Sequence, residues 1–307
     1  LLKPTFYKFL FELKRFCQEA NGALGKNELD GLSLGEFLNS RKFSKQLIND
    51  YVLPIGASIW STPSNEMLRF PARTFLNFFK NHGLLSLKNR PRWQTVVGGS
   101  QEYVKIFQKS FLGEIKLNSP VKSVTRGEFG VTLNTKDVES QFDYLIFALH
   151  ADQVLPIFTN PTSAEQSLFS KWSYNYNHTI LHTDLSVMPD NKRAWASWNY
   201  HAENSSEGQS LSVTYDMNRL QGLETLERYL VTLSPNHEIN PQKIIREYHY
   251  YHPLYTSDSL LTQEPIRQLN GQSAIFYCGS YLGYGFHEDA VVSANNLAKH
   301  FNVKELV

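Results

Sequence analysis

The sequence predicts an α/β fold with α+β character, in which strand–loop–helix units are combined with a helical block and a large sheet. Three observations lead to this prediction. A short apolar run, a glycine-rich stretch and a helical pattern follow one another from Ser273 to His300. Residues 1–91 have the apolar periodicity of helices, and residues 174–252 alternate as strands do. A chain of 307 residues can bury a large core and form two domains.

The first helix is predicted to begin at Pro4, a favourable residue at the first helical position. Apolar residues then recur at three- and four-residue steps, at Phe6, Phe9, Leu10, Leu13, Phe16 and Cys17. We expect this stripe to face the core. A membrane-surface helix over Lys3–Glu19 is the alternative, although Glu12 and Glu19 dilute its basic face.

Capping residues, prolines and glycines place the other helices of the first block. The polar stretch Asn21–Gly31 is expected to be a loop, and Ser33–Glu36 has the pattern of a capping box. Pro54 is expected to end the helix before it. After the first helix, the predicted helices are 33–38, 44–52, one that starts at Thr62-Pro63 and breaks at Phe70-Pro71, and 72–81, which Gly83 stops.

Beyond Arg92 the pattern changes to short strands. Trp93–Val97 is expected to be a strand, followed by a turn at Gly98-Gly99-Ser100 and a helix over Gln101–Ser110. The next predicted strands are 114–117, 121–126 and 131–135, with a hairpin turn at 127–130. The apolar run 142–149 is predicted to be a strand buried on both faces, as in a parallel sheet, and a helix is expected to begin at 150–152.

Residues 174–270 are predicted to form a meander followed by a helix. The expected strands are 178–184, 194–200, 211–216, 229–233 and 245–251, with turns at 188–191 and 204–208, and the helix is 259–269. This order fits a large mixed or antiparallel sheet with helices on one face. His178 and His182 could share a strand face, but cross-strand packing is the preferred interpretation and no metal site is predicted.

The C-terminal unit is predicted to bind a ligand through its backbone. Gly279-Ser280 follows a strand, and Gly283 and Gly285 bracket Tyr284 before a helix begins after Phe286. Glycines let a ligand approach the main chain, and a helix start presents unpaired N–H groups that favour phosphate or another electron-rich group. Acidic residues 288 and 289 would also favour a helix start by themselves, so an ordinary acidic helix start stays as the alternative.

The composition excludes several classes of protein. Lys plus Arg number 30 against 29 for Asp plus Glu, which gives no electrostatic footprint for nucleic acid. No apolar run approaches the length of a transmembrane helix. The two cysteines, Cys17 and Cys278, are far apart in sequence and do not indicate a disulfide framework, so we expect a cytoplasmic protein. The motifs of zinc proteases, serine hydrolases and P-loop proteins are absent from the sequence.

Three motifs resemble one protein family. Cys278-Gly279-Ser280 with the following Gly283–Asp289 resembles the C-terminal FAD-binding segment of the flavin-containing amine oxidase and phytoene desaturase superfamily. The runs Leu53–Pro63 (LPIGASIWSTP) and Trp195–His201 (WASWNYH) resemble its bacterial branch of NAD/FAD-binding proteins. Many members carry an acidic residue where this chain has Ser280. The resemblance extends along essentially the whole chain, in the same motif order.

The resemblance implies which residues bind FAD and which line the substrate cavity. The backbone near Val121 and Val124 is expected along the adenine, and the strand end at Ala148 near the pyrophosphate. The other implied FAD-binding residues are Gly98, Gly99, Ser100, Gly279, Ser280, Gly283, Tyr284, Gly285, Phe286, His287 and Glu288. The implied cavity residues are Trp60, Trp195, Trp198, Asn199 and Tyr200. The two glycine turns, at residues 98 and 283, are expected to converge on one nucleotide.

The same resemblance implies two domains. An incomplete FAD/NAD(P)-binding Rossmann-like domain is expected over 92–150 and 271–302, and a substrate domain over 1–91 and 151–270. The sequence contains no G-x-G-x-x-G motif, which the family places in an N-terminal βαβ unit. We therefore expect that unit to lie outside this sequence, and FAD to bind the chain weakly without it.

The expected function is FAD-dependent oxidation of amine-oxidase type. Flavin N5 would remove a hydride from a small amine or from an apolar, lipid-like substrate. The sequence assigns no general base and no oligomeric state. The alternative is a non-catalytic fragment or binding module with an incomplete nucleotide groove.

Overall fold

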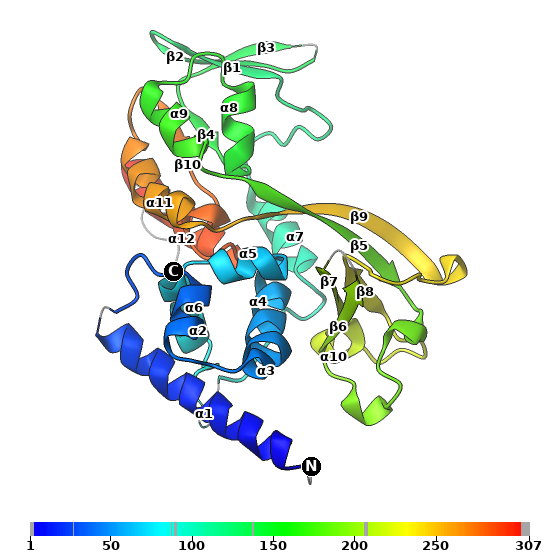
Figure 1. Ribbon diagram of the computed structural model, residues 1–307. Coiled ribbons are helices and arrows are strands. Elements are labelled where there is room, and N and C mark those ends of the chain that lie inside the picture. The colour runs from blue at the N-terminus through cyan, green and yellow to red at the C-terminus, as the bar shows by residue number, and fades with distance from the viewer. Residues whose placement is uncertain are drawn as a thin grey trace. The chain divides into compact units, whose positions relative to one another are not determined.

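The protein is described by a computed structural model that covers residues 3–26, 28–86, 88, 91–136, 138–205 and 208–301 (Figure 1). The chain divides into two compact units, each made of two segments. Unit 1 comprises Leu1–Gly113 and Asn175–His252, and unit 2 comprises Glu114–Tyr174 and Pro253–Val307. No helix in the described ranges combines the length and the apolar character that crossing a membrane requires.

Unit 1 begins with a block of helices, as predicted. The helices are α1 (Pro4–Gly25), α2 (Leu34–Ser40), α3 (Lys45–Leu47), α4 (Leu53–Trp60), α5 (Ser64–Arg69), α6 (Ala72–Asn81) and α7 (Gln101–Ser110), and a π-helical turn, η1, spans Ile48–Val52. The capping box is confirmed, because the Ser33 hydroxyl accepts from Glu36 N and the Glu36 carboxylate accepts from Ser33 N.

Helix α1 is longer than predicted. The expected loop from Asn21 is wrong at its start, because the helix continues to Gly25 and buries Ala20 and Ala23. Asn21 is held by donating to the carbonyl oxygens of Cys17 and Leu85. The stripe faces the core in its second half, where Phe16 is fully buried, whereas Phe6, Leu10 and Phe11 near the start are exposed.

Pro54 does not end a helix, contrary to the prediction. It lies in the first turn of α4, which continues directly from α3 through the π-turn η1. A proline ring clashes with the carbonyl four residues earlier in a regular α-helix. The wider π-turn, closed by a bond from Leu53 N to Ile48 O, relieves this clash and lets the helical path continue.

Two predicted strands are absent from the structure. Trp93–Val97 and Glu114–Leu117 are irregular and exposed. In the described ranges neither segment has a neighbouring strand to pair with, and an unpaired extended segment gains no ladder hydrogen bonds. The helix predicted after Ser100 is confirmed as α7, but the described residues of that helix include none that is buried.

Unit 1 also holds a five-stranded sheet in the order β6-β7-β8-β5-β9. The strands are β5 (Tyr174–His182), β6 (Trp198–Ser205), β7 (Gly208–Asp216), β8 (Leu230–Leu233) and β9 (Ile244–Pro253). The pairs β6–β7, β7–β8 and β5–β8 are antiparallel. All five strands were predicted, although β6 begins later than expected. The helix α10 (Met217–Gln221) and the 3-10 turns η3 (Leu185–Val187), η4 (Lys192–Ala194) and η5 (Pro241–Lys243) lie in its connections.

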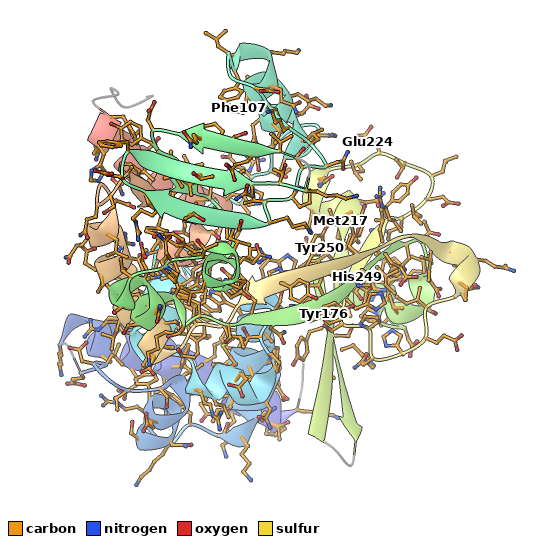
Figure 2. All side chains as sticks on the ribbon, turned by 90° about the horizontal axis from the view of Figure 1, so that it is seen from above. Phe107, Tyr176, Met217, Glu224, His249 and Tyr250 are labelled. Atoms are coloured by element: carbon orange, nitrogen blue, oxygen red, sulfur yellow. The ribbon has the colours of Figure 1, made fainter. Side chains whose placement is uncertain are left out.

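The two faces of this sheet have different surroundings. On one face the Tyr215 hydroxyl donates to Ser58 O, and Asn175 donates to Ser61 O, so this face packs against α4. The opposite face carries buried Ile180 and His182 and, towards β9, the exposed pair Tyr176 and His249, whose side chains are joined at 2.6 Å (Figure 2).

Unit 2 contains two smaller sheets. The antiparallel sheet β1-β2-β3 is formed by Ser123–Gly127, Gly130–Asn134 and Glu139–Phe142, and its first turn is the predicted hairpin. The parallel pair β10-β4 is formed by Ile275–Tyr277 and Leu145–Phe147. The helices are α8 (Val154–Ile157), α9 (Ser163–Phe169), α11 (Ser257–Leu269) and α12 (His287–Ala298), with 3-10 turns η2 (Ala151–Gln153), η6 (Ser280–Leu282) and η7 (Lys299–Phe301) (Figure 1).

The apolar run 142–149 is divided rather than continuous. Phe142 ends β3, and a new strand, β4, begins at Leu145. The parallel pairing is confirmed, but burial on both faces is wrong because Ile146 is 45% exposed. Within the described residues β4 has one neighbour, β10, so one edge and part of one face of the strand are uncovered.

The bounds of the two units differ from those of the two predicted domains. Residues 92–113 belong to unit 1, whereas 151–174 and 253–270 belong to unit 2 together with the core of the predicted FAD domain. The units are defined by packing and the predicted domains by their role towards a cofactor. The division by role therefore stays a prediction.

A buried carboxylate joins the end of β5 to the segment before β9. Asp184 accepts hydrogen bonds from Ser186 N, Asn240 N and Lys243 Nζ. Burial by itself would raise the pKa of this carboxyl, but the hydrogen bonds outweigh it and hold the pKa well below its ordinary value. A depressed folded-state pKa means that the charge contributes stability above the ordinary pKa and loses it as the pH falls.

We therefore expect Asp184→Asn to lower the free energy of unfolding by about 2 kcal/mol at neutral pH, the typical worth of hydrogen bonds to a charged group. The difference from the wild type should shrink as the pH falls below about 4, where the unfolded-state carboxyl protonates. Urea titrations at pH 7 and at pH 3 measure both values. A difference that is equal at the two pH values would contradict this account.

Candidate functional site

The candidate site in unit 2 is built where two parallel strands end. Cys278 N donates to Phe147 O, so β10 and β4 finish at the same edge. A side chain at Gly279 would begin 3.7 Å from Leu149 O. The segment after β4, which contains the predicted Ala148, therefore meets the predicted Gly279–Ser280 turn. Crevices at the carboxyl ends of parallel strands are where α/β proteins bind ligands.

The glycines of the loop are required by its packing. A Cβ atom at Gly279 would lie 2.7 Å from the Tyr281 ring, and one at Gly283 would overlap the carboxylate of Asp289. Gly285 has a φ of +97°, and a Cβ there would lie 2.9 Å from the Tyr255 hydroxyl. The N–H groups of the three glycines are also used inside the protein, since those of Gly283 and Gly285 donate to Ser280 O and that of Gly279 donates to Ser293 Oγ.

Helix α11 holds this loop in place. Gln263 Nε2 donates to the carbonyl oxygens of Tyr281 and Gly283, each at 2.9 Å, and Arg267 donates to Leu282 O. Three consecutive carbonyl groups are thus bound from one side. This fixes the course of the backbone before any ligand arrives, which reduces the entropy lost on binding.

An aromatic cluster lies beneath the loop. The Trp172 ring packs edge-on against Tyr255 and Tyr281, at 5.7 and 5.4 Å between ring centroids. The Tyr281 hydroxyl is buried and has no hydrogen-bond partner among the described residues. Burial raises the pKa of both tyrosines, so their hydroxyls stay protonated and can donate. A buried donor without a partner is costly.

A second part of the cluster surrounds the end of β4. His150 stacks on Tyr174 at 4.4 Å, and the Tyr174 hydroxyl accepts from Ala151 N. Burial raises the pKa of Tyr174 to about 12. Burial also raises the pKa of Asp152, one of whose buried oxygens has no partner among the residues described. These groups form a polar rim next to the loop.

The start of α12 is capped by its own sequence. The Asp289 carboxylate accepts from Phe286 N at 2.9 Å, and Glu288 is exposed beside it. Two carboxylates repel a phosphate placed at the same helix start. The predicted residues Phe286, His287 and Glu288 therefore suit a ligand that carries hydroxyl or N–H donors rather than a phosphate.

The predicted adenine segment lies in unit 2 as well. Val124 is buried in β1, and its carbonyl oxygen accepts from Thr159 N. Val121 is half-buried and precedes β1. The backbone of Val124 is thus engaged within the protein on both edges of its strand, by β2 and by Thr159. The segment nearer Val121 is the one better placed to offer its backbone to a ligand.

The other predicted glycine turn belongs to unit 1. Gly98 and Gly99 have φ values of +82° and +88°, and Gly99 N donates to Val96 O. Ser100 precedes α7 without a side-chain capping bond. Both glycines therefore have the positive φ that glycine adopts readily, as expected for the predicted glycine turn. Because residues 98 and 283 lie in different units, their convergence on one ligand stays a prediction.

The predicted cavity residues separate into two groups. Trp198 is 38% exposed and contacts Tyr215 and Trp93 edge-on, at 5.8 and 6.5 Å. Tyr200 alternates with it on the same sheet face, the one that packs against α4. The cavity role of these two residues stays a prediction.

The remaining three predicted cavity residues are used in internal packing. Trp60 is buried among Phe70, Phe75 and Phe78 of the helical block. Asn199 bonds both main-chain groups of Ala196 and forms a turn. Trp195 packs against a separate apolar cluster, and its indole N–H donates to Pro189 O.

Several residues of the site were missed by sequence reasoning. Tyr255, Tyr281, Gln263 and Arg267 belong to no motif, and their roles arise from contacts between α11 and the loop. Tyr174 and Trp172 reach the loop from a third segment. Among the described residues, no group of three or more metal-ligating side chains occurs.

Comparison with known proteins assigns the chain to a family. The family model of flavin-containing amine oxidoreductases matches residues 8–300. The chain belongs to the flavin-containing amine oxidoreductase family. The resemblance of the sequence motifs is thereby confirmed. No curated protein matches the sequence.

Solved structures share the fold at low sequence identity. A CLA-producing fatty acid isomerase from P. acnes matches with a TM-score of 0.67 and 15% identity, over 95% of this chain and 75% of that chain. Putrescine oxidase bound to putrescine has a TM-score of 0.66 and 13% identity, over 98% and 77%. Cyclohexylamine oxidase from Brevibacterium oxydans has a TM-score of 0.60 and 11% identity, over 98% and 77%.

The described residues of unit 2 provide part of what a flavin dinucleotide requires. The start of α12 offers carboxylate acceptors for hydroxyl and N–H donors, whereas the N–H groups of the three loop glycines are used inside the protein. That Gly279–Gly285 holds the pyrophosphate stays a prediction.

We expect Gly283→Ala to lower the free energy of unfolding by about 1–3 kcal/mol, because its methyl group would overlap the Asp289 carboxylate that caps α12. Gly22→Ala is the matched control. Gly22 lies on an exposed part of α1 with nothing within 4 Å of an added methyl group, so that substitution should raise the stability by about 0.5–1 kcal/mol. Urea titration measures both, and equal effects would contradict the packing described for the loop.

Proposed function

We propose that the protein is an FAD-dependent oxidoreductase of amine-oxidase type. The observation that carries the proposal is the glycine-rich loop Gly279–Gly285, which α11 holds at the common edge of two parallel strands. Family membership supports a flavin as the ligand of this loop. When bound, the flavin supplies the hydride acceptor for oxidation of a substrate C–H bond.

The substrate face that we propose is the face of the five-stranded sheet that carries Trp198. Strand register places Tyr215, Val213, Val231 and Leu181 on the same face. In the described part of β5, β6, β7 and β8, this face has no Asp, Glu, Lys or Arg side chain. Burial raises the pKa of Tyr215 to about 12, so these four strands present an uncharged surface on this face at neutral pH, and Arg246 of β9 lies at its edge.

A neutral aromatic face favours a neutral, apolar substrate. A cationic amine would have to lose its hydration without a carboxylate to pair with, which is costly. We infer that an amine substrate reaches this face as the free base, or that the substrate is an apolar molecule without a charge. A free-base amine already has the lone pair that assists hydride loss, so the face itself needs no general base.

The compartment is part of the same proposal. Cys17 and Cys278 are both buried in the described structure and form no disulfide, which supports a reducing, cytoplasmic setting. Burial raises the pKa of the Cys278 thiol, so it is a poor nucleophile despite its position beside Gly279.

The test is to titrate FAD into the purified protein and follow binding by flavin fluorescence and by the visible spectrum at saturating FAD. We expect saturable binding of FAD, and bleaching of the flavin spectrum under anaerobic conditions when benzylamine or cyclohexylamine is added. A folded protein that binds no FAD would contradict the proposal and favour a non-catalytic binding module.

Trp198→Phe should raise the KM for benzylamine about tenfold and leave FAD affinity unchanged, because it removes aromatic area from the proposed substrate face. Trp195→Phe is the matched control, since that ring packs in a separate cluster. It should leave the KM unchanged. Steady-state oxygen consumption measures the KM, and equal effects of the two substitutions would contradict the assignment of the face.

A further inference from the structure

Glu165 forms a buried network that links three elements of unit 2. The residue is 3% exposed and lies in α9. Its Oε1 accepts from Arg126 Nη2 of β1 and from the Tyr277 hydroxyl of β10, both at 2.6 Å. Its Oε2 accepts from Thr162 N at 2.7 Å. Three donors from three parts of the chain thus converge on one carboxylate.

The network is built to tolerate a buried charge. An isolated ion is expensive to remove from water, and pairing offsets the cost where geometry and hydrogen bonds are complete. Arg126 meets this requirement in part, because its Nη1 donates to Asn160 O and its guanidinium lies over the Phe158 ring at 4.9 Å, while its buried Nε has no hydrogen-bond partner among the described residues. Burial and the hydrogen bond to Glu165 raise the pKa of Tyr277, so its hydroxyl stays a donor.

The two ends of the network belong to segments with separate expected roles. Arg126 lies in β1, the strand that follows Val121, and β1 is further fixed by the bond from Arg126 N to Asn160 Oδ1. Tyr277 ends β10, directly before Cys278 and the Gly279–Gly285 loop, and its ring stacks on Phe147 of β4 at 5.5 Å. The carboxylate therefore bonds the expected adenine segment and the expected pyrophosphate segment at once.

We propose that Glu165 is a positioning residue for the dinucleotide, holding β1 at the distance from β10 that one extended FAD molecule requires. This inference rests on the function proposed above. When two parts of one ligand bind two segments, the second contact gains an effective concentration that depends on the spacing of the segments. A small shift between the segments removes this gain without weakening either contact by itself.

This role makes a prediction that a purely stabilising role does not. If Glu165 sets the spacing, its loss lowers the affinity for FAD, which spans both segments. The affinity for half-ligands, which contact one segment each, falls far less. FMN lacks the adenylate half, and AMP lacks the flavin half. If Glu165 only stabilises unit 2, its loss lowers the affinity for all three ligands by the same factor, or changes none of the three affinities.

The experiment measures the dissociation constants of FAD by flavin fluorescence quenching, and those of FMN and AMP by competition with FAD. The proteins are the wild type, Glu165→Gln and Tyr277→Phe, at a temperature at which each is folded. For Glu165→Gln we expect FAD to bind at least tenfold more weakly, with FMN and AMP within twofold of the wild type. Tyr277→Phe keeps the ion pair between Arg126 and Glu165 and should lower the affinity for FAD about threefold. This second variant preserves the test if Glu165→Gln fails to fold.

Asp216→Asn is the matched control. Asp216 is a fully buried carboxylate that is paired with Arg228 and Arg219, but it lies in the sheet of unit 1. The Asp216→Asn substitution should lower the stability of the protein and leave the ratio of FAD to FMN affinity unchanged. Parallel changes of FAD and FMN affinity in Glu165→Gln, or unchanged affinities in both network variants, would overturn the inference. A wild-type protein that binds no FAD would overturn the proposed function, and this inference with it.

Discussion

The parallel pairing of β4 with β10 is the constraint on which the candidate site depends. Parallel strands end at the same edge, so the segment after Phe147 and the segment after Tyr277 are brought together. Gly279 then packs against Tyr281 and Leu149, and α11 binds the loop carbonyl groups from one side. An antiparallel pairing would send the two segments to opposite edges, and no common loop site would exist.

Buried carboxylates connect separate elements of this fold. Glu165, Asp184 and Asp216 are buried carboxylates, and each is bonded to cations or N–H groups from other elements. They fix the arrangement of these elements, because a buried charge is stable only in the few arrangements in which its partners surround it. On the sheet face that carries Trp198, the described parts of β5, β6, β7 and β8 have no carboxylate side chain.

Local signals predicted most elements of this fold. The alternation of β7 and β8, the Gly127–Gly130 hairpin and the capping box at Ser33 depend on neighbouring residues, and the structure confirms them. Trp93–Val97 failed because a strand also needs a partner, which its own residues cannot specify. The motif glycines were likewise visible, whereas Tyr255 and Gln263 were not, since their contacts with the loop cross about twenty to thirty positions without a recurrent spacing.

The sequence by itself determined the family, the order of the elements and the places where the backbone had to be bare, because motifs and periodicities are local in the chain. The tertiary structure decided which aromatic residues are core and which are surface. Trp60 and Trp198 look equivalent in sequence, yet one is enclosed by three phenylalanines and the other lies on a sheet face. Burial is a property of the packed assembly, and hydrophobicity alone cannot distinguish a filled core from a binding surface.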